Sequence, residues 1–236
     1  MKKVGVLFLH GFTGGPFEIR PLYRFLSART NWVLRSPTLT GHGIPLQLDH
    51  PYATAEHWMY ESKRAYEELA QEVDEVIVVG FSMGGLLAIQ LSQHYPIKAL
   101  VLLSAAAKYG QPQLLMNDLY IKLQAEKKRM HYPQQTFFHL YDYKLQHTSI
   151  RATLHFLDVL RATRPCFRKI QTPTLLVHGR KDGIVPFSSS LMLYNLIQHQ
   201  EKQLIASDEG KHHICYSLDA EGWFHHVLRF LKRQRA

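Results

Sequence analysis

The sequence has few cysteines and no long apolar segment. Only Cys166 and Cys215 occur among its 236 residues, so we expect no dependence on disulfides and a reducing, cytoplasmic location. No apolar run approaches the roughly 20 residues that span a bilayer as a helix. The apolar start, Val4–Leu9, runs directly into His10-Gly11-Phe12 without a small-residue cleavage site. It therefore predicts a first strand and not a signal peptide.

Patterns that bind metals or nucleic acids are also missing. The chain has 15 histidines, but no His-x3-His pair shares a helical face with a carboxylate, and no paired-cysteine motif occurs. We therefore expect no metal and no cofactor. The net charge is +9, yet no nucleic-acid-binding module accompanies it, so no nucleic-acid partner is expected.

The excess positive charge is concentrated in one segment. Residues 105–170 hold 11 of the 28 Lys and Arg residues but only 4 of the 19 Asp and Glu residues. A solvated helical surface is the simpler interpretation. Attraction to anionic lipid or to an acidic substrate is the functional alternative, and it would allow weak association with a membrane surface.

Apolar, β-branched stretches alternate with helical patterns along most of the chain. This alternation is typical of an α/β fold with a parallel sheet covered by helices on both faces. The expected strands are Val4–Leu9, Trp32–Arg35, Val76–Val79, Ala99–Leu103, Thr174–His178 and Gln203–Ala206. The expected helices are Pro16–Arg29, His57–Glu72, Leu86–His94 and Glu221–Arg233.

Residues 105–172 interrupt the alternation, because they contain no convincing strand and are helix-like, aromatic and basic. A stretch of about 65 residues is far longer than the usual two to six residues between a strand and a helix. We expect an inserted helical cap here, over the strand ends where open α/β sheets bind ligands. Residues 1–104 and 173–236 would then form the core.

The segment Gly80-Phe81-Ser82-Met83-Gly84 lies between an expected strand and an expected helix. Glycines two residues before and after the serine allow a tight turn that exposes its hydroxyl beside the helix N-terminus. This pattern predicts a nucleophile elbow with Ser82 as the nucleophile. One oxyanion donor would be the N–H of Met83, and the loop after the first strand offers the N–H of Phe12 as the second.

A serine nucleophile needs a base, and the base needs an acid that orients it. In this arrangement they follow in the order Ser, then Asp or Glu, then His. Asp182 follows the fifth expected strand and is the candidate acid, with a purely turn-forming role as the alternative. The loop after the last strand contains His212 and His213, and only one of the two can face the serine.

These motifs together resemble the α/β-hydrolase superfamily, and more narrowly its small bacterial carboxylesterases and monoacylglycerol lipases with a compact cap. The segments that carry the resemblance are His10-Gly11-Phe12-Thr13-Gly14, Gly41-His42-Gly43, Gly80–Gly85 and Lys181-Asp182. It implies an α/β-hydrolase fold of about six mostly parallel strands, without the first two strands usual in that fold. The family pattern Ser-Gly-His-Val-Ile favours His212 as the base, with Lys211 in place of the family's glycine.

The resemblance also implies a serine carboxylesterase that hydrolyses a small-molecule ester of short-to-medium acyl chain through an acyl-enzyme, without a cofactor. A monoacylglycerol lipase or lysophospholipase is the alternative that keeps the same chemistry. A ligand-binding protein of the same fold that has lost hydrolysis is the alternative from another functional class.

Overall fold

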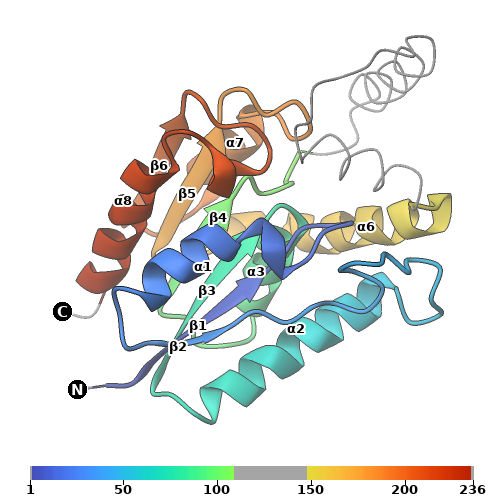
Figure 1. Cartoon of the computed structure of the whole chain (residues 1–236), viewed down its shortest axis with the longest axis horizontal. Coiled ribbons are helices and arrows are strands. Elements are labelled where there is room, and N and C mark those ends of the chain that lie inside the picture. The colour runs from blue at the N-terminus through green and yellow to red at the C-terminus, as the bar shows by residue number, and fades with distance from the viewer. Residues whose placement is uncertain (1, 109–147, 235–236) are drawn as a thin grey trace.

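The structure is a computed structural model that describes residues 2–108 and 148–234. Its centre is one six-stranded sheet with the order β2-β1-β3-β4-β5-β6, and every neighbouring pair of strands is parallel (Figure 1). The strands are β1 (Val4–Leu9), β2 (Val33–Arg35), β3 (Glu75–Phe81), β4 (Ala99–Leu103), β5 (Thr174–Gly179) and β6 (Lys202–Ser207). The predicted α/β fold with about six parallel strands is confirmed.

Helices cover both faces of the sheet, which explains why the strands are apolar on both sides. The α-helices are α1 (Arg20–Ser27), α2 (Ala55–Ala70), α3 (Met83–Leu91), α6 (Ile150–Thr163), α7 (Ser188–Leu196) and α8 (Ala220–Arg233). The 3-10 helices are η1 (Pro16–Glu18), η2 (Arg164–Lys169) and η3 (Ile214–Tyr216). Along β1, Val6 and Phe8 pack into the core under α1 and α8, whereas Leu7 and Leu9 pack into the core under α2, α3 and α6.

The first expected helix is divided in the structure. The 3-10 helix η1 begins at Pro16, and α1 begins only at Arg20, with Ile19 between them at φ −111° and ψ 4°. Pro21 stands in the first turn of α1, where a residue without an N–H is tolerated because that N–H has no partner within the helix. The division leaves Glu18 buried instead of on a helix surface.

The described part of residues 105–172 packs against the core. Helix α6 lies on α3 and α2, and its buried side chains include Phe156 and Leu160. Residues 109–147 of the expected cap lie outside the described residues. In the part of the chain that is described, no helix is long and apolar enough to cross a membrane.

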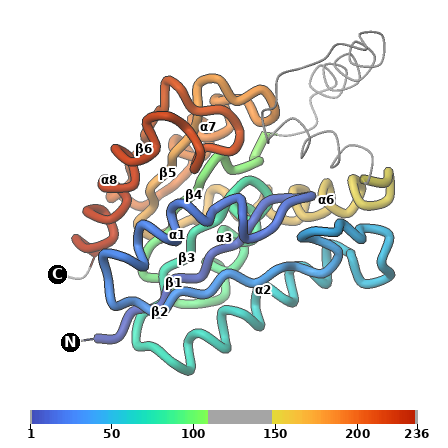
Figure 2. The backbone as a smooth tube through the Cα atoms, viewed as in Figure 1, coloured from blue at the N-terminus to red at the C-terminus, as the bar shows by residue number. Residues whose placement is uncertain are grey.

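The start of β1 and the end of α8 lie on the same side of the molecule, where the strands begin (Figure 2). The loops that follow the strands lie at the opposite edge of the sheet. Because the strands are parallel, the loops after β1, β3, β5 and β6 all gather at that edge. The residues expected to carry chemistry lie in these four loops.

Candidate active site

Ser82 lies at the turn between β3 and α3 in a strained backbone conformation. Its φ is 53°, in the left-handed region that residues other than glycine rarely adopt. The turn is held by its own backbone, because the Ser82 N–H donates to the Leu103 carbonyl at 2.9 Å and the Ser82 carbonyl accepts from the Gly85 N–H at 3.0 Å. Such local strain persists only where the surrounding structure enforces it, and it is concentrated at functional sites.

Glycines on both sides of Ser82 permit the close packing of this turn. A Cβ added to Gly80 would lie 2.3 Å from the Gly84 carbonyl oxygen, and one added to Gly84 would lie 2.1 Å from the Leu9 carbonyl oxygen. Both distances are far below any contact that a Cβ atom makes in proteins, and the opposing atoms belong to the backbone. The turn therefore requires glycine at both positions, as the pattern predicts.

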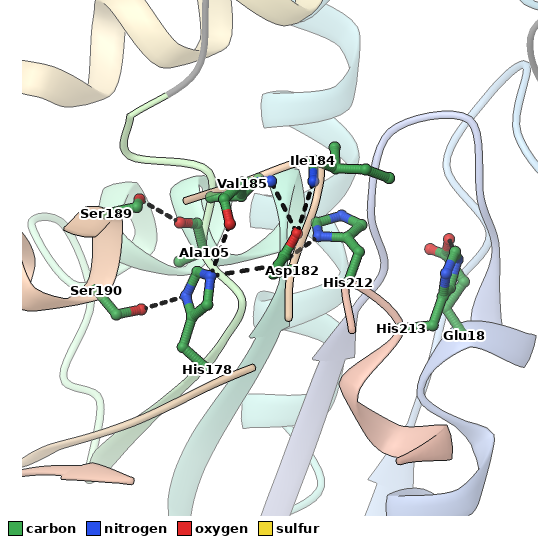
Figure 3. Close-up of polar contacts among 10 residues, drawn as sticks. All are labelled: Glu18, Ala105, His178, Asp182, Ile184, Val185, Ser189, Ser190, His212 and His213. Atoms are coloured by element: carbon green, nitrogen blue, oxygen red, sulfur yellow. Dashed lines mark hydrogen bonds and ion pairs between the residues drawn. The ribbon is translucent and has the colours of Figure 1, made fainter. Parts of the chain in front are cut away.

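Asp182 and His212 lie in direct contact, although 30 residues separate them (Figure 3). The His212 Nδ1 lies 2.9 Å from Asp182 Oδ2. Because the carboxylate can only accept, the proton of a neutral His212 is on Nδ1, and Nε2 carries the free lone pair. The Phe81 ring, one residue before Ser82, lies 5.0 Å from the His212 ring, so the imidazole is adjacent to the elbow.

The Asp182 carboxylate is fully buried and held at both oxygens. Its Oδ1 accepts the backbone N–H groups of Ile184 and Val185, both at 2.9 Å. Burial alone raises the pKa of a carboxyl group and is the largest single influence on Asp182. The positive charge that His212 carries when protonated and the hydrogen bonds from His178 and His212 together outweigh it and hold the pKa of Asp182 well below its usual range. The carboxylate therefore stays ionised at neutral pH.

A second histidine contacts the same carboxylate. His178, at the end of β5, places Nε2 at 3.3 Å from Asp182 Oδ2 and at 2.9 Å from the Val185 carbonyl oxygen (Figure 3). Both partners are acceptors, so Nε2 carries the proton and Nδ1 accepts from the Ser190 hydroxyl at 2.7 Å. His178 uses both nitrogens in these contacts, which fits a structural role beside Asp182.

The loops that carry Asp182 and His212 meet through two glycines. A Cβ on Gly179 would lie 2.1 Å from the Gly210 carbonyl oxygen, and a Cβ on Gly210 would lie 2.8 Å from the Gly179 Cα. The Lys181 N–H donates to the same Gly210 carbonyl at 3.0 Å. This close backbone approach brings the two loops within reach of one hydrogen bond between their side chains.

His213 points away from Asp182. Its Nε2 lies 3.2 Å from Oε1 of Glu18, the last residue of η1, which follows β1 (Figure 3). The two adjacent histidines thus contact different carboxylates, His212 that of Asp182 and His213 that of Glu18. Of the two candidate bases, His212 is the one that the structure brings to the candidate acid.

The peptide group between Gly11 and Phe12 is fixed in orientation. The Gly11 carbonyl accepts from His10 Nδ1 at 2.8 Å and from the Gly14 N–H at 3.3 Å. Because this peptide bond is trans, the Phe12 N–H points the opposite way from that carbonyl. The ring of His10 is itself held, since its Nε2 accepts the Leu39 N–H at 3.0 Å.

Met83 supplies a second N–H near the serine. It is the first residue of α3, and the N–H groups of the first helical turn have no partner within the helix. The side chain of Ser82, the N-cap residue, makes no capping hydrogen bond at this helix end. The positive end of the helix dipole adds to the attraction for negative charge at this point.

Comparison with protein families matches residues 5–219 to the family described as Hydrolase_4, serine aminopeptidase, S33. The chain belongs to this family. Among curated proteins, it is 26% identical over 230 residues to a carboxylesterase of Bacillus subtilis, covering 97% of this chain and 92% of that protein. It is also 26% identical over 213 residues to a thermostable monoacylglycerol lipase of a Bacillus species, covering 89% of this chain and 82% of the lipase.

Solved structures of lipolytic enzymes share the fold. One, described under the names LipS and LipT as metagenome-derived lipolytic enzymes, aligns with a TM-score of 0.78 at 22% identity, covering 99% of this chain and 96% of its own. A monoacylglycerol lipase of Paleococcus ferrophilus aligns with a TM-score of 0.73 at 17% identity, covering 99% and 98%. The resemblance to the α/β-hydrolase superfamily, and to its carboxylesterases and monoacylglycerol lipases, is confirmed.

In this family member, aromatic side chains surround the loop after β1. The Phe12 ring stacks on Phe156 of α6 at 5.1 Å and lies 5.9 Å from the Trp58 ring of α2. His42 contacts the Trp58 ring at 5.0 Å, and burial lowers its pKa to about 3. The rings of Trp58, Phe156 and His42 beside Phe12 therefore form an apolar cluster that is uncharged at neutral pH.

Sequence reasoning missed Glu18, and it predicted a structural role for His178 without its contact with Asp182. Both lie at positions that suggest ordinary structural roles, a strand end and a helix surface. His178 precedes Gly179 and stands four residues before Asp182, a spacing that could have indicated contact across the turn. The described residues contain no cluster of three or more His, Cys, Asp or Glu that could hold a metal ion.

Proposed function

We propose that this hydrolase is a serine carboxylesterase that cleaves esters through an acyl-enzyme. The family match and its esterase and lipase relatives support a hydrolase that acts on ester bonds. The observation that carries the finer assignment is the 2.9 Å contact between His212 Nδ1 and Asp182 Oδ2, in the loops beside the elbow of Ser82. This contact leaves His212 Nε2 as an acceptor for the serine proton.

The proposed reaction has two halves. The Ser82 hydroxyl attacks the ester carbonyl while His212 Nε2 takes its proton, and the ionised Asp182 stabilises the imidazolium. The proton then passes to the alcohol oxygen as that group leaves, and the acyl group stays on Ser82. Water repeats the same sequence with His212 as its base, which releases the carboxylic acid and restores the serine.

The oxyanion of each tetrahedral intermediate would be bound by the N–H groups of Phe12 and Met83. Donors of this kind act best when their orientation is fixed before reaction. The contacts at the Gly11 carbonyl fix the peptide of Phe12, and the start of α3 fixes that of Met83. No cofactor takes part in this scheme.

We assign the substrate as a small-molecule ester with a short-to-medium acyl chain. The aromatic rings of Phe12, Trp58 and Phe156 form an apolar group beside the proposed oxyanion donor. A monoacylglycerol lipase is the second candidate, since the relative of that name covers 89% of this chain. The basic composition of residues 105–170 favours it too, because such a segment attracts anionic lipid.

The test of the assignment is hydrolysis of p-nitrophenyl esters with acyl chains of two to sixteen carbons. We expect wild-type activity to be greatest on short-to-medium chains. Ser82→Ala should lower kcat by about 10⁴-fold or more, and Asp182→Asn by on the order of 10³- to 10⁴-fold, because it no longer holds the correct tautomer.

Ser92→Ala is the matched control, since Ser92 caps the other end of α3 and donates to the Ile89 carbonyl. It should keep wild-type kcat. A folded wild-type protein that hydrolyses no ester of the series would contradict the esterase assignment and favour a ligand-binding role. Hydrolysis that persists in Ser82→Ala would contradict the assigned nucleophile.

A further inference from the structure

Glu18 is a buried carboxylate outside the proposed proton-transfer chain. Its side chain is only 1% exposed. Removing a charged carboxylate from water carries a large free-energy cost unless hydrogen-bonding partners replace the water. The partners of Glu18 therefore indicate why a glutamate is present at this point of the fold.

Two of these partners come from different loops of the site. Glu18 Oε2 accepts the Gly11 N–H at 3.0 Å, within the loop after β1. Glu18 Oε1 accepts from His213 Nε2 at 3.2 Å, within the loop after β6, across 195 residues of sequence. One carboxylate thus joins the loop of the proposed oxyanion donor to the loop of the proposed base.

The loop after β1 is folded directly onto this carboxylate. A Cβ added to Gly14 would lie 1.9 Å from Glu18 Oε2, so only glycine leaves room for the side chain. The Tyr216 hydroxyl donates to the Phe17 carbonyl and makes a second tie between the same two loops. The two loops therefore meet in one contact region.

Glu18 contacts the residue next to a proposed reacting group in each loop: Gly11 next to Phe12, and His213 next to His212. In the first loop, Glu18 holds the N–H of Gly11 while His10 and Gly14 hold its carbonyl. The contacts at the carbonyl fix the peptide that carries the Phe12 N–H, and the contact with Glu18 fixes the peptide directly before it. In the second loop, His213 is the residue next to His212, so fixing its side chain restricts the backbone of the proposed base.

We propose that Glu18 and His213 are positioning residues that hold the oxyanion loop and the base loop in register. This inference rests on the proposed function, and it gives the second histidine of the pair a role other than that of a base. A displacement of about 1 Å in a catalytic group can cost on the order of 10²-fold in rate. The contact should therefore affect kcat and leave KM nearly unchanged.

The experiment compares His213→Ala with His213→Gln in the p-nitrophenyl butyrate assay. A glutamine amide nitrogen can occupy the place of Nε2 and donate to Glu18, but it cannot take a proton from Ser82. We expect kcat to fall about 10- to 100-fold in His213→Ala with KM within about threefold, and His213→Gln to restore most of it. His94→Gln, at an exposed histidine, is the control.

A double variant tests whether the two residues act as a unit. If they do, Glu18→Ala combined with His213→Ala should lose no more kcat than the worse of the two single variants. Should His213→Ala fail to fold, Glu18→Gln is measured in its place. Glutamine keeps the volume of glutamate, but its amide NH₂ faces one of the two donors, the Gly11 N–H or His213 Nε2. Glu18→Gln should lower kcat about tenfold with KM unchanged.

The outcomes separate this inference from the proposed function. Wild-type kcat in a folded His213→Ala, or in Glu18→Gln where that variant replaces it, would overturn the positioning role alone. A His213→Gln variant as inactive as His213→Ala would overturn it too, because it would point to His213 as the base. An inactive wild type would overturn the proposed function, and this inference with it.

Discussion

The role of each histidine at this site is set by its partners. His178 and His10 each use both ring nitrogens in hydrogen bonds, and their partners are a hydroxyl, carbonyls, a backbone N–H and, for His178, also the Asp182 carboxylate. His212 is held through Nδ1 alone among its described contacts, by a carboxylate that cannot donate. An imidazole held in this way presents a lone pair at a fixed place, which a general base requires.

The sequence alone identified a candidate residue only where its position relative to the predicted strands and glycines was enough to assign it. Ser82 is marked by its glycines, and Asp182 by its place after a strand. The choice between His212 and His213 depends on the directions of two neighbouring side chains in a loop. That choice needed a family pattern, because the amino-acid sequence of a loop does not by itself fix the directions of its side chains.

The buried imidazole of His42 should make the protein sensitive to acid. Burial is the main cause that lowers its pKa to about 3, whereas the unfolded chain has a histidine pKa of about 6.5. Between these values the unfolded state binds one more proton than the folded state. The free energy of unfolding should therefore fall by about 1.4 kcal/mol per pH unit from this group as pH decreases through that window.

His42→Asn removes the titration and keeps a donor at the place of Nδ1, which donates to the Thr40 carbonyl at 3.2 Å. Urea unfolding of wild type and His42→Asn between pH 6.5 and pH 4 measures the effect. The pH slope of the variant should be smaller by roughly 1 kcal/mol per pH unit. The control His94→Asn, at an exposed histidine, should keep the wild-type slope, and equal slopes in all three proteins would contradict the prediction.

At the scale of elements, the strand–turn–helix around Ser82 leaves no room for a side chain at its glycines. A Cβ at Gly84 would meet the Leu9 carbonyl oxygen at 2.1 Å, and a backbone atom in the central sheet cannot move aside. Gly84→Ala should therefore destabilise the protein by about 3 kcal/mol or more and abolish esterase activity. Thermal unfolding and the p-nitrophenyl butyrate assay measure both effects.

Gly222 in α8 provides the matched substitution, because nothing lies within 4 Å of a Cβ added there. Gly222→Ala should stabilise the protein by about 0.5–1 kcal/mol, since alanine favours a helix more than glycine does. It should also leave kcat unchanged. If Gly84→Ala were as stable as wild type, the packing at the elbow would not require a glycine.

The strands could be predicted because burial on both faces produces continuous apolar runs, as in β1 and β4. Most helices could be predicted because their apolar residues recur at helical spacing. The division of the first helix could not. It depends on Glu18 turning inward to meet Gly11 and His213, and a glutamate near the start of a helix looks like an ordinary surface residue. A tertiary contact here outweighed the local helical pattern.

At the scale of the whole molecule, parallel strands explain how distant residues meet. Phe12 follows β1, Ser82 follows β3, and Asp182 and His212 follow β5 and β6. Because these strands are parallel, their carboxyl ends lie at one edge of the sheet, and all four loops gather there. This could be predicted from the sequence, because alternation of strand and helix fixes the direction of every strand.

The charge of the whole molecule gives the prediction that separates the two substrate candidates. The chain carries a net charge of +9, with most of the excess in residues 105–170. Each Lys or Arg near an anionic membrane contributes about 1 kcal/mol of attraction at physiological ionic strength. A monoacylglycerol carried in anionic vesicles should therefore be hydrolysed faster than in neutral vesicles at low salt.

Salt should remove this difference, because the screening length falls from about 10 Å at 0.1 M to about 3 Å at 1 M. Rates on both kinds of vesicle, measured from 0.02 M to 1 M NaCl, test the effect. Hydrolysis of p-nitrophenyl acetate, a neutral substrate free in solution, is the control and should change little with salt. Equal rates on neutral and anionic vesicles at the lowest salt would remove the electrostatic case for a lipid surface. The carboxylesterase acting on soluble esters would then be the better account of the same active site.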